Sequence, residues 1–306
     1  MAAYFMKFSS VLKNFRVLNL FIVALSQILI YYVCFGGLIS SGRAILQDSV
    51  FYVFIGITVL LALCAYLIND YFDVYTDDVN QKKKLSTKDR KTLLLSYWIL
   101  SITGFFLSLW VATRTNNLGL LWIYPFVSIL LYYYSKSLKG KAFWGNLVVA
   151  LACALVPGML LVAEWPNLQF IKENYPFELS LFAFYLIFAF LSTLYRELIK
   201  DMEDMKGDLA ENHTTLPISI GLENSKYIAV LESVMLSILI VVWLIYFDPS
   251  MFGKLTLGLI LFMNLYSIIK LKSAWSPSDF HRISFLIKIM MLIGLIYLLF
   301  VKHFYA

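Results

Sequence analysis

The chain has few charged residues and few cysteines. Only 14% of its 306 residues are Asp, Glu, Lys or Arg, whereas 61% are hydrophobic. A soluble protein of this length would not carry so many long apolar runs, so the composition excludes a soluble globular fold and predicts an all-α, polytopic membrane protein. Cys34, Cys64 and Cys153 stand singly inside apolar segments. This placement indicates neither a disulfide framework nor a zinc site.

Long apolar runs recur along the chain at intervals suited to a bilayer. A membrane-spanning helix needs about 20 apolar residues. Residues 1–16 are short and basic and lead directly into the first apolar run, so no cleavable signal peptide is expected. The runs predict nine transmembrane helices, at 17–40, 50–69, 92–113, 118–135, 143–163, 178–199, 227–247, 252–270 and 283–301.

The basic residues are distributed unevenly between the loops. The net charge is +6, and most lysines and arginines fall in loops on the same side as the N-terminus. This asymmetry predicts an N-in, C-out multi-pass protein, in the inner membrane if the source is bacterial. It explains the positive charge without a nucleic-acid partner, and the lipid bilayer is the expected surroundings of the whole chain.

The same acidic pattern, D-x-x-D-x-x-x-D, occurs twice in a chain with only 19 acidic residues. On a helix, offsets of three and seven residues fall within an arc of roughly 60°. Each pattern therefore predicts a stripe of carboxylates on one helix face, after the second and the sixth apolar run, on the cytoplasmic side. Crowded carboxylates repel one another and favour cations. The six residues are Asp70, Asp73, Asp77, Asp201, Asp204 and Asp208.

The residues beside the two stripes suit a phosphorylated substrate. Carboxylate and amide oxygens are ligands that Mg²⁺ prefers, and Mg²⁺ usually keeps positions for water and substrate phosphate. Asn69 adjoins the first stripe, and Arg196 and Lys200 precede the second. Both cations can contact phosphate oxygens. A single acidic stripe is equally consistent with a solvated loop, whereas two matched stripes favour a metal–diphosphate site.

At these motifs the chain resembles the UbiA superfamily of intramembrane prenyltransferases. Residues 69–77 match the family's N-D-x-x-D-x-x-x-D, and the second acidic motif lies within R-E-L-I-K-D-M-E-D-M-K-G-D at 196–208. The T-L-P segment at 215–217, Gly221, the Y-S-K-S-L-K element at 134–139 and Gly145-Asn146 also match. The resemblance covers most of the chain, as a single domain over residues 1–306 with a possible internal repeat of 17–142 and 143–282.

The resemblance implies nine helices around a central cavity that holds the chain of a polyprenyl diphosphate. It assigns catalysis and Mg²⁺ binding to the six aspartates, with Asn69 as a further metal ligand. Diphosphate binding falls to Asn69, Arg196, Lys200, Lys139 and Tyr134. Tyr66, Tyr71 and Tyr134 are the aromatic residues expected near the allylic cation. The form of the second motif is similar to that of digeranylgeranylglyceryl phosphate synthases, which implies a geranylgeranyl donor and a lipid acceptor such as geranylgeranylglyceryl phosphate.

Three other functions stay open at this point. The acceptor of the prenyl group can instead be an aromatic or quinone precursor. The paired acidic motifs can belong to a cation transporter, although Arg196 and Lys200 would repel its cargo. The chain can also bind substrate without turnover, because residues 80–85 read N-Q-K-K-K-L where many relatives have a loop with proline and arginine.

A second departure from the family lies just after the second motif. Asn212 stands where relatives carry glycine. Asn tolerates the left-handed backbone conformation better than other residues with a side chain, so the turn is expected to survive. The three histidines, His213, His281 and His303, lie in or near loops or at the terminus and indicate no general base.

Overall fold

The computed structural model describes residues 17–72, 87–247 and 250–305. Within these ranges the only extended contact is an isolated bridge between Lys141 and Thr214, and almost everything else is helical. The long helices are α2 (Val17–Cys34), α4 (Asp48–Phe72), α6 (Thr87–Arg114), α7 (Gly119–Tyr133), α8 (Trp144–Ala163), α10 (Pro176–Ala210), α12 (Leu222–Phe247), α13 (Met251–Lys272) and α14 (Pro277–Tyr305).

Each predicted span corresponds to one of these helices, which confirms the all-helical membrane fold. Eight of the helices in the described part are long and apolar enough to cross a bilayer. The remaining one, α7, has only 15 residues but continues into a π-helical turn, Tyr134–Leu138. The prediction of one helix over 17–40 was wrong: α2 ends at Cys34, and a separate short helix, α3 (Gly36–Ser40), follows Phe35. Two adjacent glycines at this point favour a break because glycine is a poor helix former.

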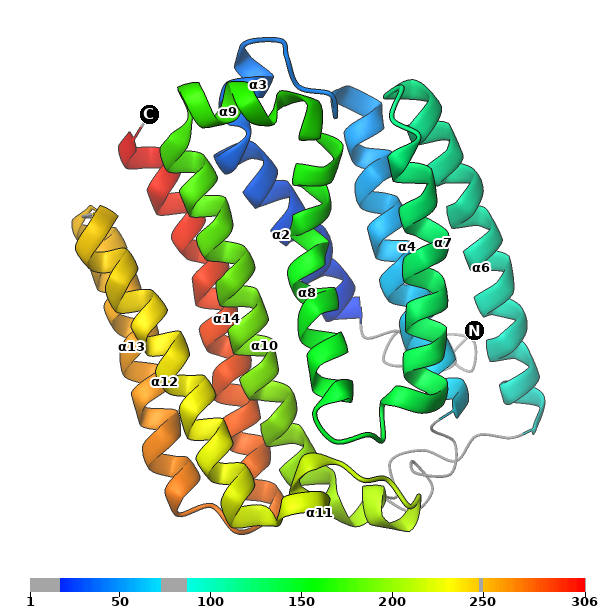
Figure 1. Ribbon diagram of the computed structural model, residues 1–306, viewed down its shortest axis with the longest axis vertical. Coiled ribbons are helices and arrows are strands. Elements are labelled where there is room, and N and C mark those ends of the chain that lie inside the picture. The colour runs from blue at the N-terminus through cyan, green and yellow to red at the C-terminus, as the bar shows by residue number, and fades with distance from the viewer. Residues whose placement is uncertain (1–16, 73–86, 248–249, 306) are drawn as a thin grey trace, which may run out of the picture.

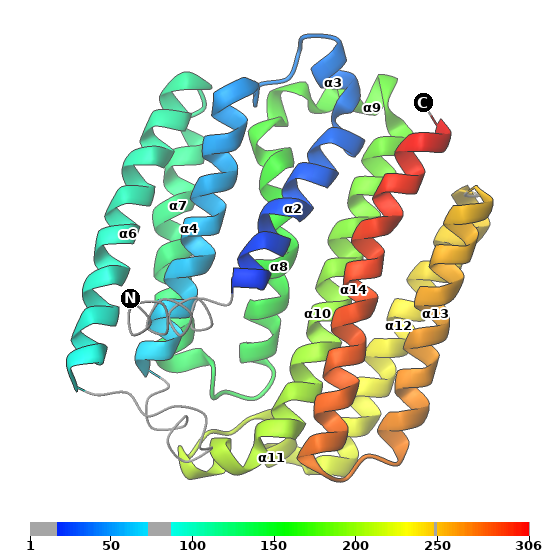
Figure 2. The same ribbon diagram turned by 180° about the vertical axis from the view of Figure 1, so that it is seen from behind.

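The helices form a bundle with α10 near its centre (Figure 1). Helices α4, α6 and α7 stand on one side, and α12, α13 and α14 stand on the other, with α2 and α8 between them in both views (Figure 2). Helix α10 contacts α2, α8, α12 and α14. It is also the longest helix, with 35 residues, so it connects the packed interior to the end of the bundle.

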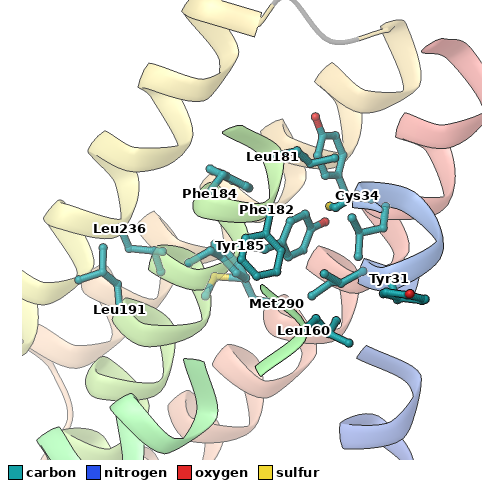
Figure 3. Packing of buried hydrophobic residues seen from close by; sticks show 14 of the residues in the cluster. Tyr31, Cys34, Leu160, Leu181, Phe182, Phe184, Tyr185, Leu191, Leu236 and Met290 are labelled. Carbon is teal, nitrogen blue, oxygen red and sulfur yellow. The ribbon is translucent and has the colours of Figure 1, made fainter. Parts of the chain in front are cut away.

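One cluster of buried hydrophobic residues joins four of these helices. Phe182 and Tyr185 of α10, Tyr31 of α2, Leu160 of α8 and Met290 of α14 are all buried in one cluster (Figure 3). Lipid tails are as apolar as these side chains, so close packing and hydrogen bonds between helices hold such a bundle together rather than exclusion from water.

A buried carboxylate fixes the connection between α2 and α4. Glu164, which follows the last residue of α8, is fully buried. It accepts hydrogen bonds from the Tyr31 hydroxyl at 2.8 Å and from the backbone N–H groups of Ile45 and Leu46, both at 3.0 Å. Asn167 donates a further bond at 2.9 Å. A buried charge needs several such donors, so this residue holds the end of the bundle where α3 and α9 (Leu168–Asn174) lie.

Candidate active site

The two helices that carry the acidic motifs end on the same face of the bundle. Helix α4 ends at Phe72 and α10 at Ala210, and both ends lie away from α3 and α9, at the end where the short helix α11 (Leu216–Ile220) is found (Figure 1). The C-terminal end of a helix carries a partial negative charge. Carboxylates placed there add to that charge, so this face attracts cations.

The second motif lies entirely on α10. The hydrophobic pattern predicted that this helix would end near residue 199, but it continues without a break to Ala210. Asp201, Asp204 and Asp208 therefore occupy successive turns of one helix, in the stripe that their spacing predicts. The stripe begins where α10 still packs against α8 and ends close to the helix terminus.

Asp201 is held by an amide from the neighbouring helix. Asn146 Nδ2 in the first turn of α8 donates a hydrogen bond of 2.8 Å to Asp201 Oδ2. The sequence singled out Asn146 as part of the Gly145-Asn146 match to the family, and the structure shows it in contact with the second motif. The preceding Gly145 lets the Lys139 backbone pack closely against the start of α8, because a Cβ atom there would lie 2.8 Å from the backbone oxygen of Lys139.

The two predicted diphosphate-binding cations share one carboxylate. Glu197 accepts a bond of 3.1 Å from Arg196 Nη1 and one of 2.9 Å from Lys200 Nζ. All three side chains are only partly exposed. Sequence reasoning missed Glu197, although its position three residues before Lys200 was a usable signal for an ion pair. Glu197, one turn before the stripe, therefore fixes both cations beside its first carboxylate.

The last carboxylate of the stripe anchors the turn after α10. Asp208 is buried, and its Oδ1 lies 3.4 Å from His213 Nδ1, while Glu211 Oε2 lies 3.2 Å from His213 Nε2. Because Asp208 hydrogen-bonds the ring and carries negative charge, the pKa of His213 is raised above its ordinary value. Asn212 has a φ of 57°, which confirms the left-handed turn expected of this residue.

The connection between α7 and α8 reaches across to this turn. The Thr214 backbone N–H donates to the Gly140 carbonyl at 2.7 Å, and a Cβ atom at Gly140 would collide with the His213 ring. The π-helical turn that begins at Tyr134 contacts α4, α7 and α8. The segment that begins with Tyr134 therefore contacts α4 at one end and the turn after α10 at the other, and Lys139 interacts electrostatically with His213.

Only the start of the first acidic motif lies within the residues that the structure describes. Asn69 and Asp70 are half-buried in the last turn of α4. Tyr66 is half-buried one turn earlier, and the Arg90 guanidinium lies 4.5 Å from the centre of the Tyr71 ring. Asp73, Asp77 and the altered loop at 80–85 lie outside the described residues.

Comparison with known proteins identifies the family. The sequence pattern of the UbiA prenyltransferase family matches residues 29–301. The chain belongs to the UbiA prenyltransferase family. It is a multi-pass membrane enzyme that transfers prenyl groups, as the resemblance in its motifs implied, and this assignment favours an enzyme over a transporter.

Relatives of this UbiA protein include two archaeal proteins named digeranylgeranylglyceryl phosphate synthase. The protein of Sulfurisphaera tokodaii is 31% identical over 217 residues, which cover 69% of this chain and 70% of the relative. The protein of Methanosphaera stadtmanae is 30% identical over 257 residues, which cover 78% of this chain and 85% of the relative.

Solved structures share the fold of this UbiA protein. A structure reported for a digeranylgeranylglyceryl phosphate synthase aligns with a TM-score of 0.66 at 22% identity, over 97% of this chain and 99% of that one. A UbiA homologue from Archaeoglobus fulgidus bound to GPP and Mg²⁺ aligns with a TM-score of 0.52 at 17% identity, over 91% of this chain and 97% of that one.

The residues of this UbiA protein suit a metal that substrate helps to bind. Among the residues placed by the structure, no group of three acidic, histidine or cysteine side chains could enclose an ion without other ligands. Mg²⁺ does not require one, because it is usually bound by one or two carboxylates together with water and substrate phosphate. The α10 stripe provides carboxylates of this kind, and the Asn146 amide orients the first of them.

Proposed function

We propose that this prenyltransferase moves a geranylgeranyl group from its diphosphate to the hydroxyl group of a lipid acceptor, geranylgeranylglyceryl phosphate, in the presence of Mg²⁺. The observation that carries the proposal is the α10 stripe, with Arg196 and Lys200 fixed on Glu197 one turn before it. The names of the two archaeal relatives support the acceptor. The ligands of the Archaeoglobus fulgidus homologue support a prenyl diphosphate and Mg²⁺.

In this proposal each acidic motif holds one metal–diphosphate centre. Asn69, Asp70, Asp73 and Asp77 serve the first centre, and Asp201, Asp204 and Asp208 serve the second. Bound Mg²⁺ would neutralise charge on the diphosphate as it leaves. The motif face is cytoplasmic, since the loops on this side carry most of the basic residues.

The remaining side chains bind and orient the reactants. Arg196, Lys200 and Lys139 contact phosphate oxygens, and Tyr134 donates its hydroxyl hydrogen to them. The bond between the first prenyl carbon and the diphosphate oxygen breaks, and its electron pair leaves with the diphosphate. The acceptor oxygen then forms an ether bond to that carbon and releases its proton. Such placement of donors and cations stabilises charge that develops during the reaction.

The activity can be measured with the purified protein in lipid vesicles. Labelled geranylgeranyl diphosphate would be offered with geranylgeranylglyceryl phosphate, 4-hydroxybenzoate, homogentisate or dihydroxynaphthoate, with Mg²⁺ and with a chelator. We expect one product, from the glycerol phosphate, that is lost on chelation. A product from an aromatic acceptor alone would replace the proposed acceptor, and turnover in the chelator would contradict the metal requirement.

Two substitutions test the roles of the motifs. Asp73→Ala and Asp204→Ala should each abolish transfer, because each removes a carboxylate from one centre. Glu173→Ala is the matched control, since Glu173 is an exposed carboxylate on α9, at the other end of the bundle, and accepts a hydrogen bond from exposed Gln169. Size-exclusion profiles would show that the variants are folded. Transfer by both aspartate variants at the control rate would refute the proposed mechanism.

A further inference from the structure

One side chain on the inner face of α8 is exposed, although its neighbours on that face are buried. Ala150 and Leu160 are buried, and Asn146 contacts Asp201 of α10, so these residues define the face of α8 that turns inward. Cys153 lies on the same face, because it stands seven positions after Asn146 and seven before Leu160, or about two helical turns from each. Its side chain is nevertheless exposed.

The exposure of Cys153 differs in direction from that of Leu151. The two residues are two positions apart on α8, so their side chains point roughly 160° apart. Leu151 is 46% exposed. Helix α8 is therefore exposed on two nearly opposite sides near the middle of its span, once on the side of Leu151 and once on the side that faces α10. Exposure on this inner side requires an open space between the helices.

The neighbours of Cys153 on α10 show where this space lies. The Cys153 thiol lies beside the hydroxyl of Thr193. It is also within electrostatic range of Arg196, Glu197 and Lys200. Thr193 is only 3% exposed, and within the part of the chain that the structure describes its hydroxyl oxygen has no oxygen or nitrogen partner. The space therefore lies between α8 and α10, next to the two cations that the proposed function assigns to the diphosphate.

The position of Cys153 along α8 gives the depth of the space. Helices α8 and α10 run side by side in opposite directions, and the bond between Asn146 and Asp201 marks one level in both (Figure 1). At 1.5 Å per residue, Cys153 lies about 10 Å farther into the bundle than Asn146, and Thr193 lies about 12 Å farther than Asp201. The two side chains thus stand at nearly the same depth, on opposite walls of the space.

We propose that the space between Cys153 and Thr193 holds the prenyl chain of the donor, and that these two side chains set the length of chain that fits. This inference rests on the proposed function. Carbon–carbon bonds of about 1.5 Å give one isoprene unit an extended length of roughly 5 Å. A chain whose diphosphate is held at the level of Asp201 therefore reaches Cys153 at about its second unit. A geranyl chain ends there, whereas a geranylgeranyl chain continues past it. Small side chains on both walls leave the width that the longer chain needs.

The first arm of the test uses the native thiol. Purified protein in phosphatidylcholine vesicles would react with methyl methanethiosulfonate in the presence of Mg²⁺, alone or with inorganic diphosphate, geranyl diphosphate or geranylgeranyl diphosphate. Peptide mass spectrometry would follow each cysteine, and the buried Cys34 and Cys64 serve as internal controls. At about ten times its Kd, geranylgeranyl diphosphate should slow the modification of Cys153 roughly tenfold, because about one molecule in ten stays unliganded. Inorganic diphosphate should leave the rate unchanged.

The second arm narrows the space with Cys153→Phe. Equilibrium binding of geranyl diphosphate and geranylgeranyl diphosphate would be measured with Mg²⁺. We expect the Kd for the longer donor to rise about 10- to 100-fold relative to that for the shorter one, because a ring placed in the path of the chain overfills the space. Leu151→Phe is the matched control, since it adds the same ring on the opposite side of α8, and it should keep both Kd values. The first arm needs no substitution, so it decides the inference even where the Cys153 variant does not fold.

Three results would overturn the inference. Modification of Cys153 at the same rate with and without geranylgeranyl diphosphate would show that the chain does not pass this thiol. Equal protection by inorganic diphosphate would assign the effect to the head group, and equal losses of affinity for both donors in Cys153→Phe would show a purely structural role.

The same measurements separate the inference from the proposed function. A protein that binds no prenyl diphosphate would refute both. Protection of Cys153 by geranylgeranyl diphosphate, in a protein that transfers nothing to geranylgeranylglyceryl phosphate, would support the inference and refute the proposed acceptor.

Discussion

At the scale of single residues, the orientation of Asp201 depends on one amide donor. Asn146→Ala would remove the 2.8 Å hydrogen bond and leave Asp201 Oδ2 without this partner. Loss of a residue that orients a metal ligand typically costs about 10- to 100-fold in metal affinity or activity. We therefore expect a higher Mg²⁺ requirement for transfer, measured as the concentration that gives half-maximal rate.

The control for this prediction is Asn224→Ala. Asn224 is exposed, and its side chain bonds to the Ile220 carbonyl four positions earlier. This variant should keep the Mg²⁺ dependence of the wild type. An Asn146→Ala enzyme with the same dependence would show that Asp201 needs no such support.

The sequence predicted the residue types of the candidate site better than their partners. The two aspartate patterns could be identified from their spacing, and the cations Arg196 and Lys200 from their position just before the second pattern. The hydrogen bond between Asn146 and Asp201 could not, because it joins α8 to α10 and depends on how these helices pack. The stacking of Arg90 on Tyr71 similarly joins residues from different helices.

At the scale of single elements, the start of α8 depends on a glycine. In Gly145→Ala the new Cβ would lie 2.8 Å from the Lys139 carbonyl, too close for either backbone to stay in place. The shift would displace Asn146 and Lys139 together, so we expect reduced transfer and a lower melting temperature in detergent. Gly158→Ala, in the same helix, is the control because its Cβ would meet other side chains at 3.7 Å. Alanine there should stabilise the helix by about 0.5–1 kcal/mol, and equal behaviour of the two variants would refute the prediction.

The turn after α10 gives a second prediction about stability. Asn212 has a φ of 57°, in the left-handed region that glycine adopts without strain. Asn212→Gly should therefore retain the turn, whereas Asn212→Ala should lower the free energy of unfolding by roughly 1 kcal/mol, because other side chains are strained there. Thermal unfolding in detergent would measure the difference. An alanine variant as stable as the glycine variant would contradict the expected strain.

Helix boundaries show what hydrophobic patterns cannot detect. The patterns located every long helix, since a membrane span must be apolar. The patterns placed the end of the sixth helix at residue 199, whereas α10 continues for eleven more residues to Ala210. They placed the start of the last helix at residue 283, whereas α14 begins at Pro277. Hydropathy reports contact with lipid rather than helical conformation, so polar extensions that leave the membrane were missed. The second motif lies on such an extension.

At the scale of the whole molecule, the charge asymmetry predicts which face meets the cytoplasm. Lys206 lies on the motif face at the end of α10, and Lys254 lies at the other end of the bundle; both are exposed. In a background without the three native cysteines, Lys206→Cys should react with an impermeant maleimide only in inside-out vesicles. Lys254→Cys should react only in right-side-out vesicles. The reverse pattern would place the motifs outside the cell.

The Glu164 contacts have a consequence for synthesis and insertion. The carboxylate that satisfies Ile45 and Leu46 lies 119 and 118 positions after them. At about 5–20 residues per second, the ribosome needs roughly 6–24 s to reach it. Once residue 72 has been added, the first two long helices are complete, but the connection between them lacks its final hydrogen bonds until Glu164 is made. The connection between α2 and α4 can therefore reach its final structure only after α8 and Glu164 have been synthesised.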